Sequence, residues 1–299
     1  MRVIEPVTVT ADVLTSINVP EDEYPLWDAT KPYVKGSRVI RGHRCWEGAA
    51  DTIPAGTDPL TETGASKWAD MGATRQWAMF DQAKGTLTTR DGPIVVTLTP
   101  GRIDSLVLLE LTASKVTVAA TVNNQEVWRR VQLTQVGGRE IDNIYDWLFA
   151  PIGKRERLLF DDLPSYRNAI YTVTIEGASS TMPVACGTLL IGAMLDIGKT
   201  GSGVDIGIVD FSKKQRNDYG VITVQERGYS DSLTYSVAVQ MARIDAVKKR
   251  LADLRATPTV WIGSANLDAM LTYGYFNNFK LRVARLTGIA VCDLGVESL

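Results

Sequence analysis

The sequence predicts a mainly β protein: a small aromatic-rich β module, an antiparallel jelly-roll-like sandwich, and a β-rich C-terminal domain with one amphipathic helix. Short apolar runs separated by turn residues recur from residue 74 to the C-terminus, whereas helical spacing appears only after Gln240. The 299 residues suit two or three domains. We expect an extended segment over 1–20, a lobe over 21–73, the sandwich over 74–197 and the C-terminal domain over 198–299.

The lobe is predicted from its aromatic residues and its glycines. Three of the seven tryptophans fall within residues 24–72. Because so short a segment buries little surface, large aromatic side chains must supply most of its packing. Gly36 and Gly42 bracket one short strand, and a second strand follows through Arg44 to Glu47, which predicts a tight hairpin.

A spaced set of residues gives this lobe a family resemblance. It comprises a Trp-Asp-x-x-x-x-Tyr opening, a Gly-x-x-Val strand, a Gly-x-x-x-Trp-Glu strand, a Gly-x-x-Pro turn and a closing Trp; the positions are Trp27, Tyr33, Gly36, Val39, Trp46, Gly56, Pro59 and Trp68. This pattern resembles the short chitin- and cellulose-binding modules of the family 5/12 type. The resemblance implies that Trp27, Tyr33, Trp46 and Trp68 bind glycan.

The lobe also departs from that family. There, an aromatic pair usually follows the Glu and stacks on sugar rings, but Ala49, Ala50 and Asp51 stand at these positions here. The resemblance therefore supports the fold of the lobe better than a sugar site. The alternative role of the three tryptophans is to form the core that a small module requires.

The sandwich is predicted from strands and turns between Gly72 and the middle of the chain. A hairpin is expected where residues 116–122 face 126–133 across Asn123-Asn124-Gln125. Residues 171–176 alternate at period two, and residues 184–192 form an apolar run typical of a buried strand.

The C-terminal domain begins with a glycine-rich stretch. Residues 198–203 suggest a phosphate loop, but the spacing is wrong and the following residues favour a strand, so we expect a flexible interdomain turn. Strands are expected over 204–211, 220–225 and 233–240, and later over 259–262, 281–284 and 289–294. Between these groups, a helical apolar stripe ends before Pro258; its members are Met241, Ile244, Val247, Leu251 and Leu254.

Composition argues against several classes of function. The formal net charge of −2 and the short basic runs provide no attraction for nucleic acid. We expect no membrane span and no signal peptide, and hence synthesis in the cytoplasm. The three cysteines are Cys45, Cys186 and Cys292. Their odd number, without CxxC spacing, predicts neither a disulfide framework nor a metal site. No cofactor is expected.

Catalytic residues are not predicted either. The only histidine, His43, is expected on a hairpin, and no Gly-x-Ser-x-Gly elbow is present. Glycan hydrolysis would need two carboxylates across a cleft, and the sequence offers candidates that are equally explained as turn caps and solvated loops. These are Asp142, Asp146, Asp161 and Asp162.

The order of the segments carries a second resemblance. Residues 77–82 (Trp-Ala-Met-Phe-Asp-Gln) follow the lobe, and the strand 186–192, the segment 260–264 and the aromatic segment 273–279 come after them. This order resembles structural proteins in the tail or baseplate of tailed bacteriophages. The resemblance implies a non-enzymatic virion protein of the tail tip, baseplate or collar, synthesised in the bacterial cytoplasm, with other tail proteins and further copies of itself as partners. A protein that recognises host surface glycan is the alternative.

An assembly interface is predicted near the C-terminus. Four aromatic residues crowd residues 273–279 in a pattern too irregular for one strand face or one helix stripe, so some should lie near the surface. The alternative is a loop that packs them inward. The four are Tyr273, Tyr275, Phe276 and Phe279.

Overall fold

The computed structural model describes residues 1–135, 144, 154–216, 219–264, 270–283 and 289–299. It confirms the predicted mainly β class: strands make up 53% and helices 8% of the protein, and the antiparallel sheets include a curled half-barrel. The contacts divide the chain into two compact units, Met1–Pro6 with Gly192–Leu299, and Val7–Ile191. The boundary between them falls inside strand β16 (Thr188–Asp196), whereas the sequence suggested residue 197.

A β-sandwich makes up most of the unit Val7–Ile191. One layer is a five-stranded sheet in the order β12-β11-β14-β9-β2, and the strands β13, β10 and β16 pair in a second layer. Alternate residues point inward, as period two requires, so that one continuous core fills the space between the layers. The strands are β2 (Leu14–Ile17), β9 (Ile94–Leu98), β10 (Ser105–Leu109), β11 (Lys115–Val122), β12 (Gln125–Leu133), β13 (Leu158–Phe160) and β14 (Ile170–Glu176), and a separate pair is β8 (Thr88–Asp91) with β15 (Pro183–Cys186).

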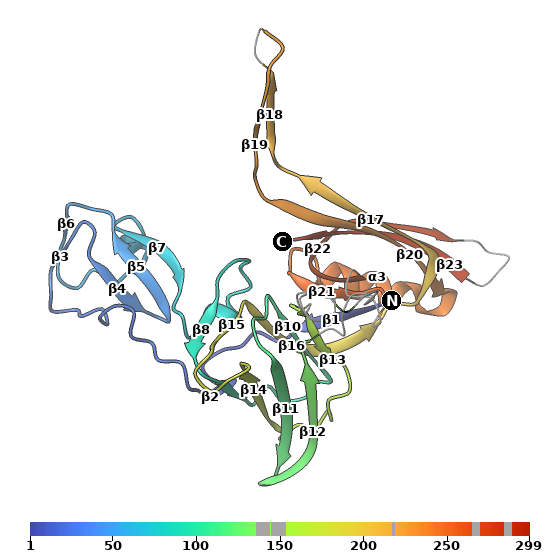
Figure 1. Ribbon diagram of the computed structural model, residues 1–299, viewed down its shortest axis with the longest axis horizontal. Coiled ribbons are helices and arrows are strands. Elements are labelled where there is room, and N and C mark those ends of the chain that lie inside the picture. Colours follow the sequence, from blue (N-terminus) through green and yellow to red (C-terminus); the bar gives the residue numbers. More distant parts are fainter. Residues whose placement is uncertain (136–143, 145–153, 217–218, 265–269, 284–288) are drawn as a thin grey trace. The chain divides into compact units, whose positions relative to one another are not determined.

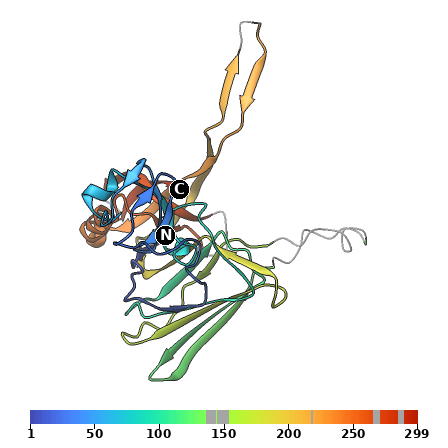
Figure 2. The same cartoon turned by 90° about the vertical axis from the view of Figure 1, so that its left-hand side faces the viewer.

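The predicted hairpin between β11 and β12 is present. Asn123 and Asn124 form its turn with φ values of 50° and 61°. Positive φ at both turn residues matches the right-handed twist of the flanking strands, and asparagine adopts this conformation more readily than most residues. Figure 2 shows the two long strands of this hairpin side by side.

The lobe contains short strands around a small core of its own. Strand β5 pairs with β4 on one side and β7 on the other, and a short bridge joins β3 to β6 (Figure 1). The predicted hairpin joins β4 and β5, and its turn residues Gly42 and His43 have φ values of 61° and 62°. The elements are β3 (Tyr33–Val34), β4 (Arg38–Arg41), β5 (Arg44–Gly48), β6 (Thr52–Ile53), α1 (Glu62–Ala65) and β7 (Trp68–Ala73), followed by the 3-10 turn η1 (Ala78–Phe80).

The other unit is one antiparallel sheet covered by a helix. The sheet runs β16-β1-β21-β22-β23-β20-β17. The predicted helix is present as η2 (Met241–Arg243) continuing into α3 (Ile244–Asp253), and Val247 and Leu251 bury its apolar stripe against the sheet. The strands are β1 (Arg2–Pro6), β17 (Lys199–Asp210), β18 (Lys213–Arg216), β19 (Ile222–Gln225), β20 (Tyr229–Gln240), β21 (Thr259–Ile262), β22 (Leu271–Val283) and β23 (Ile289–Ser298).

The glycine-rich segment differs from the sequence-based expectation. Residues 199–203 are the start of strand β17 and not a flexible turn. Lys199 pairs with Ala238, and a bulge between Thr200 and Val204 then contains the next glycines. Gly198 lies so close to β20 that an added Cβ would be 2.4 Å from the carbonyl oxygen of Ala238, which explains why a glycine stands there. The segment 1–20 contains two strands, β1 in the C-terminal unit and β2 in the sandwich.

Candidate functional site

Two of the four predicted glycan-binding residues lie in the core of the lobe. Trp46 is 9% exposed and Trp68 is 3% exposed, and both pack with Val39 and Ile53. Their indole N–H groups donate to the carbonyl oxygens of Arg41 and Thr57, at 3.0 and 3.1 Å. The structure therefore places these two tryptophans where a small module needs large apolar side chains.

The other two, Trp27 and Tyr33, are half-buried at the edge of this core. The guanidinium carbon of Arg41 lies 5.0 Å from the centroid of the Trp27 ring, and Arg41 also binds Asp58 at 2.7 Å. That hydrogen bond lowers the pKa of the Asp58 carboxyl. Tyr33 packs edge-on against Trp68, and its hydroxyl accepts a hydrogen bond from the backbone N–H of Asp28. Contacts within the lobe thus occupy a face of Trp27, and the glycan-binding role of the four residues stays a prediction.

The four aromatics of the predicted assembly interface all lie on one strand, β22. A register shift between Phe276 and Asn278 explains their irregular spacing, because the extra residue brings Phe276 and Phe279 to the same face. Phe276 lies opposite buried Val296 and packs edge-on against Trp261, and Phe279 lies opposite buried Leu294. Tyr275 is 38% exposed, while Tyr273, Phe276 and Phe279 are half-buried.

An extended exposed apolar surface lies on a segment of the C-terminal unit for which no role was predicted from the sequence. Strands β17 and β20 pair along most of their length, and β18 and β19 continue the ribbon beyond them. Every described residue from 205 to 229 is exposed, apart from half-buried Ser212. We call residues 205–216 and 219–229 the arm. Its exposed large apolar residues are Ile206, Ile208, Val209, Phe211, Tyr219, Val221, Ile222, Val224 and Tyr229.

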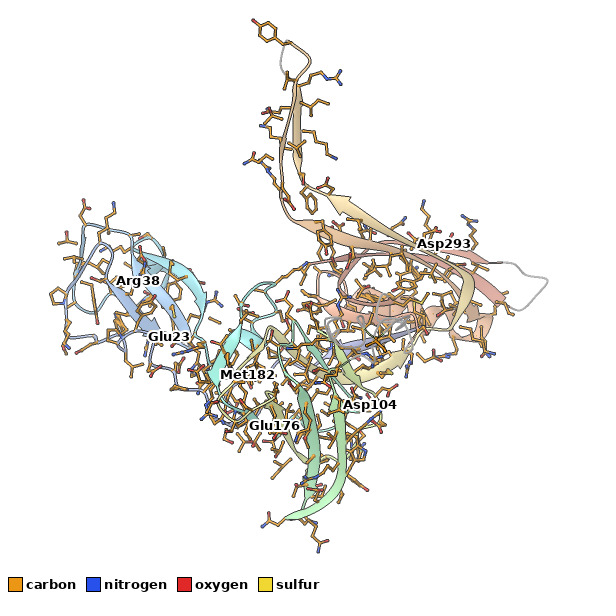
Figure 3. All side chains as sticks on the ribbon, viewed as in Figure 1. Glu23, Arg38, Asp104, Glu176, Met182 and Asp293 are labelled. Atoms are coloured by element: carbon orange, nitrogen blue, oxygen red, sulfur yellow. The ribbon has the colours of Figure 1, made fainter. Side chains whose placement is uncertain are left out.

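The outer half of the arm, strands β18 and β19, is a two-stranded ribbon. Figures 1 and 2 both show these strands projecting beyond β17 and β20, with no other element of the same unit beside them. The side chains drawn on this ribbon point outward on both sides (Figure 3). A two-stranded ribbon is only marginally stable in water by itself, so this part of the chain lacks the packing that stabilises the rest of the unit.

A polar turn fixes the base of the outer ribbon. The carboxylate of Asp210 accepts a hydrogen bond from the backbone N–H of Ser212 at 2.9 Å, and the ammonium of Lys214 lies 3.2 Å from the same carboxylate. Hydrogen bonds from the Ser212 side chain and backbone, and then from Lys214, lower the pKa of Asp210 to about 2. The carboxylate therefore holds the turn at neutral pH.

The C-terminal unit also contains a groove of about 200 Å³ between helix α3 and the strands β1 and β16. Val3, Leu195 and Leu251 belong to its apolar lining, and Arg243 and Arg250 belong to its polar lining. Both arginines already bind carboxylates, of Asp196 and Glu5 respectively. This volume is below the roughly 300 to 1,000 Å³ of small-molecule sites, so the groove is explained by helix packing.

The residues considered for catalysis make hydrogen bonds, ion pairs and ring contacts. Nδ1 of His43 lies 3.2 Å from both carboxylate oxygens of Glu21, and its ring stacks on Trp77 at 4.4 Å between centroids. Arg130 binds Asp162 at 2.6 Å and lies 3.9 Å from Asp161. Asp142 and Asp146 lie outside the described residues. In the part of the chain that the structure describes, no three His, Cys, Asp or Glu residues gather as a metal site requires.

The three cysteines are buried and unpaired. Burial raises the pKa of the Cys186 thiol to about 12 and that of Cys292 to about 11, so both are protonated at neutral pH. Within the described residues, no helix is long and apolar enough to cross a bilayer. Comparison of the sequence with models of protein families and with curated proteins gives no match.

Proposed function

We propose that this chain is a non-enzymatic structural protein of a bacteriophage tail, located in the tail tip, baseplate or collar, which assembles with further copies of itself and with other tail proteins. The observation that carries the proposal is the arm. The order of sequence segments described above supplies the class of particle, and the arm supplies a reason for the protein to assemble.

The physical reason is the exposed apolar surface of the arm. Ile206, Ile208, Phe211, Ile222 and Val224 are each more than half exposed. Isolated apolar side chains on a surface are ordinary, but a continuous series on a projecting ribbon is typical of an interaction site. Contact with a neighbouring protein removes this surface from water and holds the ribbon in place. A component of a larger particle has such neighbours.

Recognition of host surface glycan is the alternative function. The sequence spacing of the lobe supports this alternative, and Trp46 and Trp68 lie inside the lobe. Arg41 covers a face of Trp27, so this module would need another aromatic surface to stack on a sugar ring. The assembly function therefore has the better support from the geometry, and host attachment through the lobe remains compatible with it.

The test compares the full chain with a variant that lacks the outer ribbon. Asp210 and Tyr229 pair directly, so residues 211–228 can be replaced by an Asn-Gly turn without lengthening either strand. We expect rings or stable oligomers of the full chain in negative-stain microscopy, and fewer of them for the variant, whose circular dichroism should remain that of a folded β protein. A full chain that stays monomeric at every concentration and sediments with insoluble chitin would contradict the assembly function and favour the alternative.

A further inference from the structure

Strand β17 forms a long edge of the sheet in the C-terminal unit. It has 12 residues and pairs with β20 on one side, and it ends the strand order of the sheet on the other. An edge of this kind presents unpaired backbone N–H and C=O groups to another chain. Natural proteins usually protect long edges with charges, prolines or bulges. Strand β17 has Lys199 and Asp210 at its two ends and a bulge before Val204, so the stretch Val204–Val209, with Asp205 as its one charge, is the part open to another strand.

The side chains of this edge follow a period of two. Val204, Ile206 and Ile208 share one face of the strand, because side chains alternate across a sheet. Val204 lies opposite Tyr235 of β20, and Ile206 lies opposite Leu233. Both of these partners are buried in the core of the unit, whereas Ile206 and Ile208 are 55% and 69% exposed. The face that forms the core elsewhere therefore continues to the edge of the sheet without a cover.

We propose that β17 pairs in antiparallel fashion with β17 of a second copy, around a twofold axis at Ile206. This inference rests on the proposed assembly function and names the partner and the register. Each Ile206 then lies opposite the Ile206 of the second copy, and Val204 lies opposite Ile208. Asp205 lies opposite Gly207, which has no side chain to conflict with it. A self-complementary contact of this kind is the usual form of a twofold interface.

The charge pattern selects this register over its neighbours. Moving the axis to Asp205 would place two carboxylates directly opposite each other, which destabilises an antiparallel pair. Moving it to Gly207 would place Val204 opposite Asp210. A shift by a single residue in only one chain would turn the apolar face of one copy towards the polar face of the other. Centring on Ile206 matches apolar with apolar at every position from Val204 to Ile208 on this face.

The same pairing also reaches the base of the arm. Because the two β17 strands run in opposite directions, the arm that continues from Asp210 of one copy extends past the Lys199 end of the other. That end belongs to the C-terminal unit of the second copy. Phe211 of each copy then lies beside Gly201 of the other, and the twofold axis gives both arms the same environment.

A cysteine cross-link tests the register. In the proposed pair, the two Cα atoms at position 206 are about 4.5 to 5.5 Å apart, which a disulfide spans. The matched control is position 208, which is also an exposed isoleucine on the same face. Two copies of residue 208 lie four residues apart along the paired strands, roughly 13 Å, which is too far for a disulfide. The native cysteines are buried and do not interfere.

The full chain carrying Ile206→Cys should form a covalent dimer after oxidation with diamide, and Ile208→Cys should not. Val204→Cys combined with Ile208→Cys should restore the dimer, because these positions lie opposite each other. Cross-linking at 208 but not at 206, or at neither position in a chain that still forms oligomers, overturns the β17 pairing and leaves the assembly function standing. A wild-type chain that is monomeric by mass photometry overturns both.

Discussion

Removal of the Trp46 side chain should unfold the lobe while the sandwich stays intact. The ring is 9% exposed and lies against Val39, Ile53 and Trp68, so its loss leaves a cavity in the only core that the lobe has. Large-to-small changes at buried tryptophans cost about 3 to 5 kcal/mol. Trp46→Phe keeps most of the apolar contact but loses the hydrogen bond to the Arg41 carbonyl, so we expect a cost of about 1 to 2 kcal/mol.

Hydrogen exchange measured by mass spectrometry separates these effects by position. Peptides from β4 and β5 should exchange fastest in Trp46→Ala, at an intermediate rate in Trp46→Phe and slowest in the wild type. Peptides from β11 and β14 in the sandwich should be unchanged, because they belong to a different core. If Trp46→Ala leaves exchange in the lobe unaltered but abolishes retention on chitin, the ring is a binding platform and our assignment of it to the core is wrong.

Three further outcomes are expected. The free energy of unfolding should fall as pH rises from about 9 towards about 12. Burial raises the pKa of the Cys186 thiol to about 12, so this thiol ionises more readily in the unfolded chain than in the folded one. The free energy of unfolding of Cys186→Ala, measured in urea, should depend less on pH in this range. The pKa of the Asp210 carboxyl, measured by NMR, should be about 2. Because this pKa is lowered, the carboxylate should stabilise the turn fully above pH 3.8, and this stabilisation should disappear as pH falls through about 2. Phe276→Ser should destabilise the C-terminal unit by about 3 kcal/mol in urea unfolding, whereas Tyr275→Ser should change its stability by no more than about 0.5 kcal/mol; equal effects would contradict the inward packing of Phe276.

The sequence predicts the elements whose pattern is local. Asn123-Asn124 identifies a hairpin because few residue types accept positive φ, and the spacing from Met241 to Leu254 identifies a helix because one face must be apolar. Trp46 and Trp68 were recognisable as core residues from the small size of the lobe. These conclusions need only the neighbours of each residue in the chain.

Other features depend on pairing between distant residues. Strand β1 lies between β16 and β21, and nothing within residues 2–6 indicates partners so far along the chain. In β22, a single register shift breaks the period of two, so its aromatics resemble a loop. The glycines before Val204 resemble a linker, although they belong to strand β17, whose register shifts between Thr200 and Val204.

The arm was missed for a related reason. Alternation at Val204, Ile206 and Ile208 predicts a strand with one apolar face, which is correct. This alternation does not indicate how far along the strand other elements pack on the apolar face, because those elements come from residues elsewhere in the chain. One signal was available: the run Val221-Ile-Thr-Val224 follows Gly220 and a polar segment, which is typical of a hairpin turn.

A comparison of the two long edge strands explains why we expect β17 to mediate pairing between copies. Strand β12 also ends its sheet and exposes Val131 and Leu133, and both strands contain a bulge, but β12 carries the adjacent Arg129 and Arg130 in its interior, whereas the stretch Val204–Val209 of β17 carries only Asp205. Charged side chains within a strand protect its edge against another strand. Ile206→Lys gives β17 a charge of the kind that β12 already has and places two ammonium groups at the proposed axis, so it should produce monomers in mass photometry. Val131→Lys, at a comparably exposed position of β12, should leave the oligomers intact, and the reverse result would assign the contact to the sandwich.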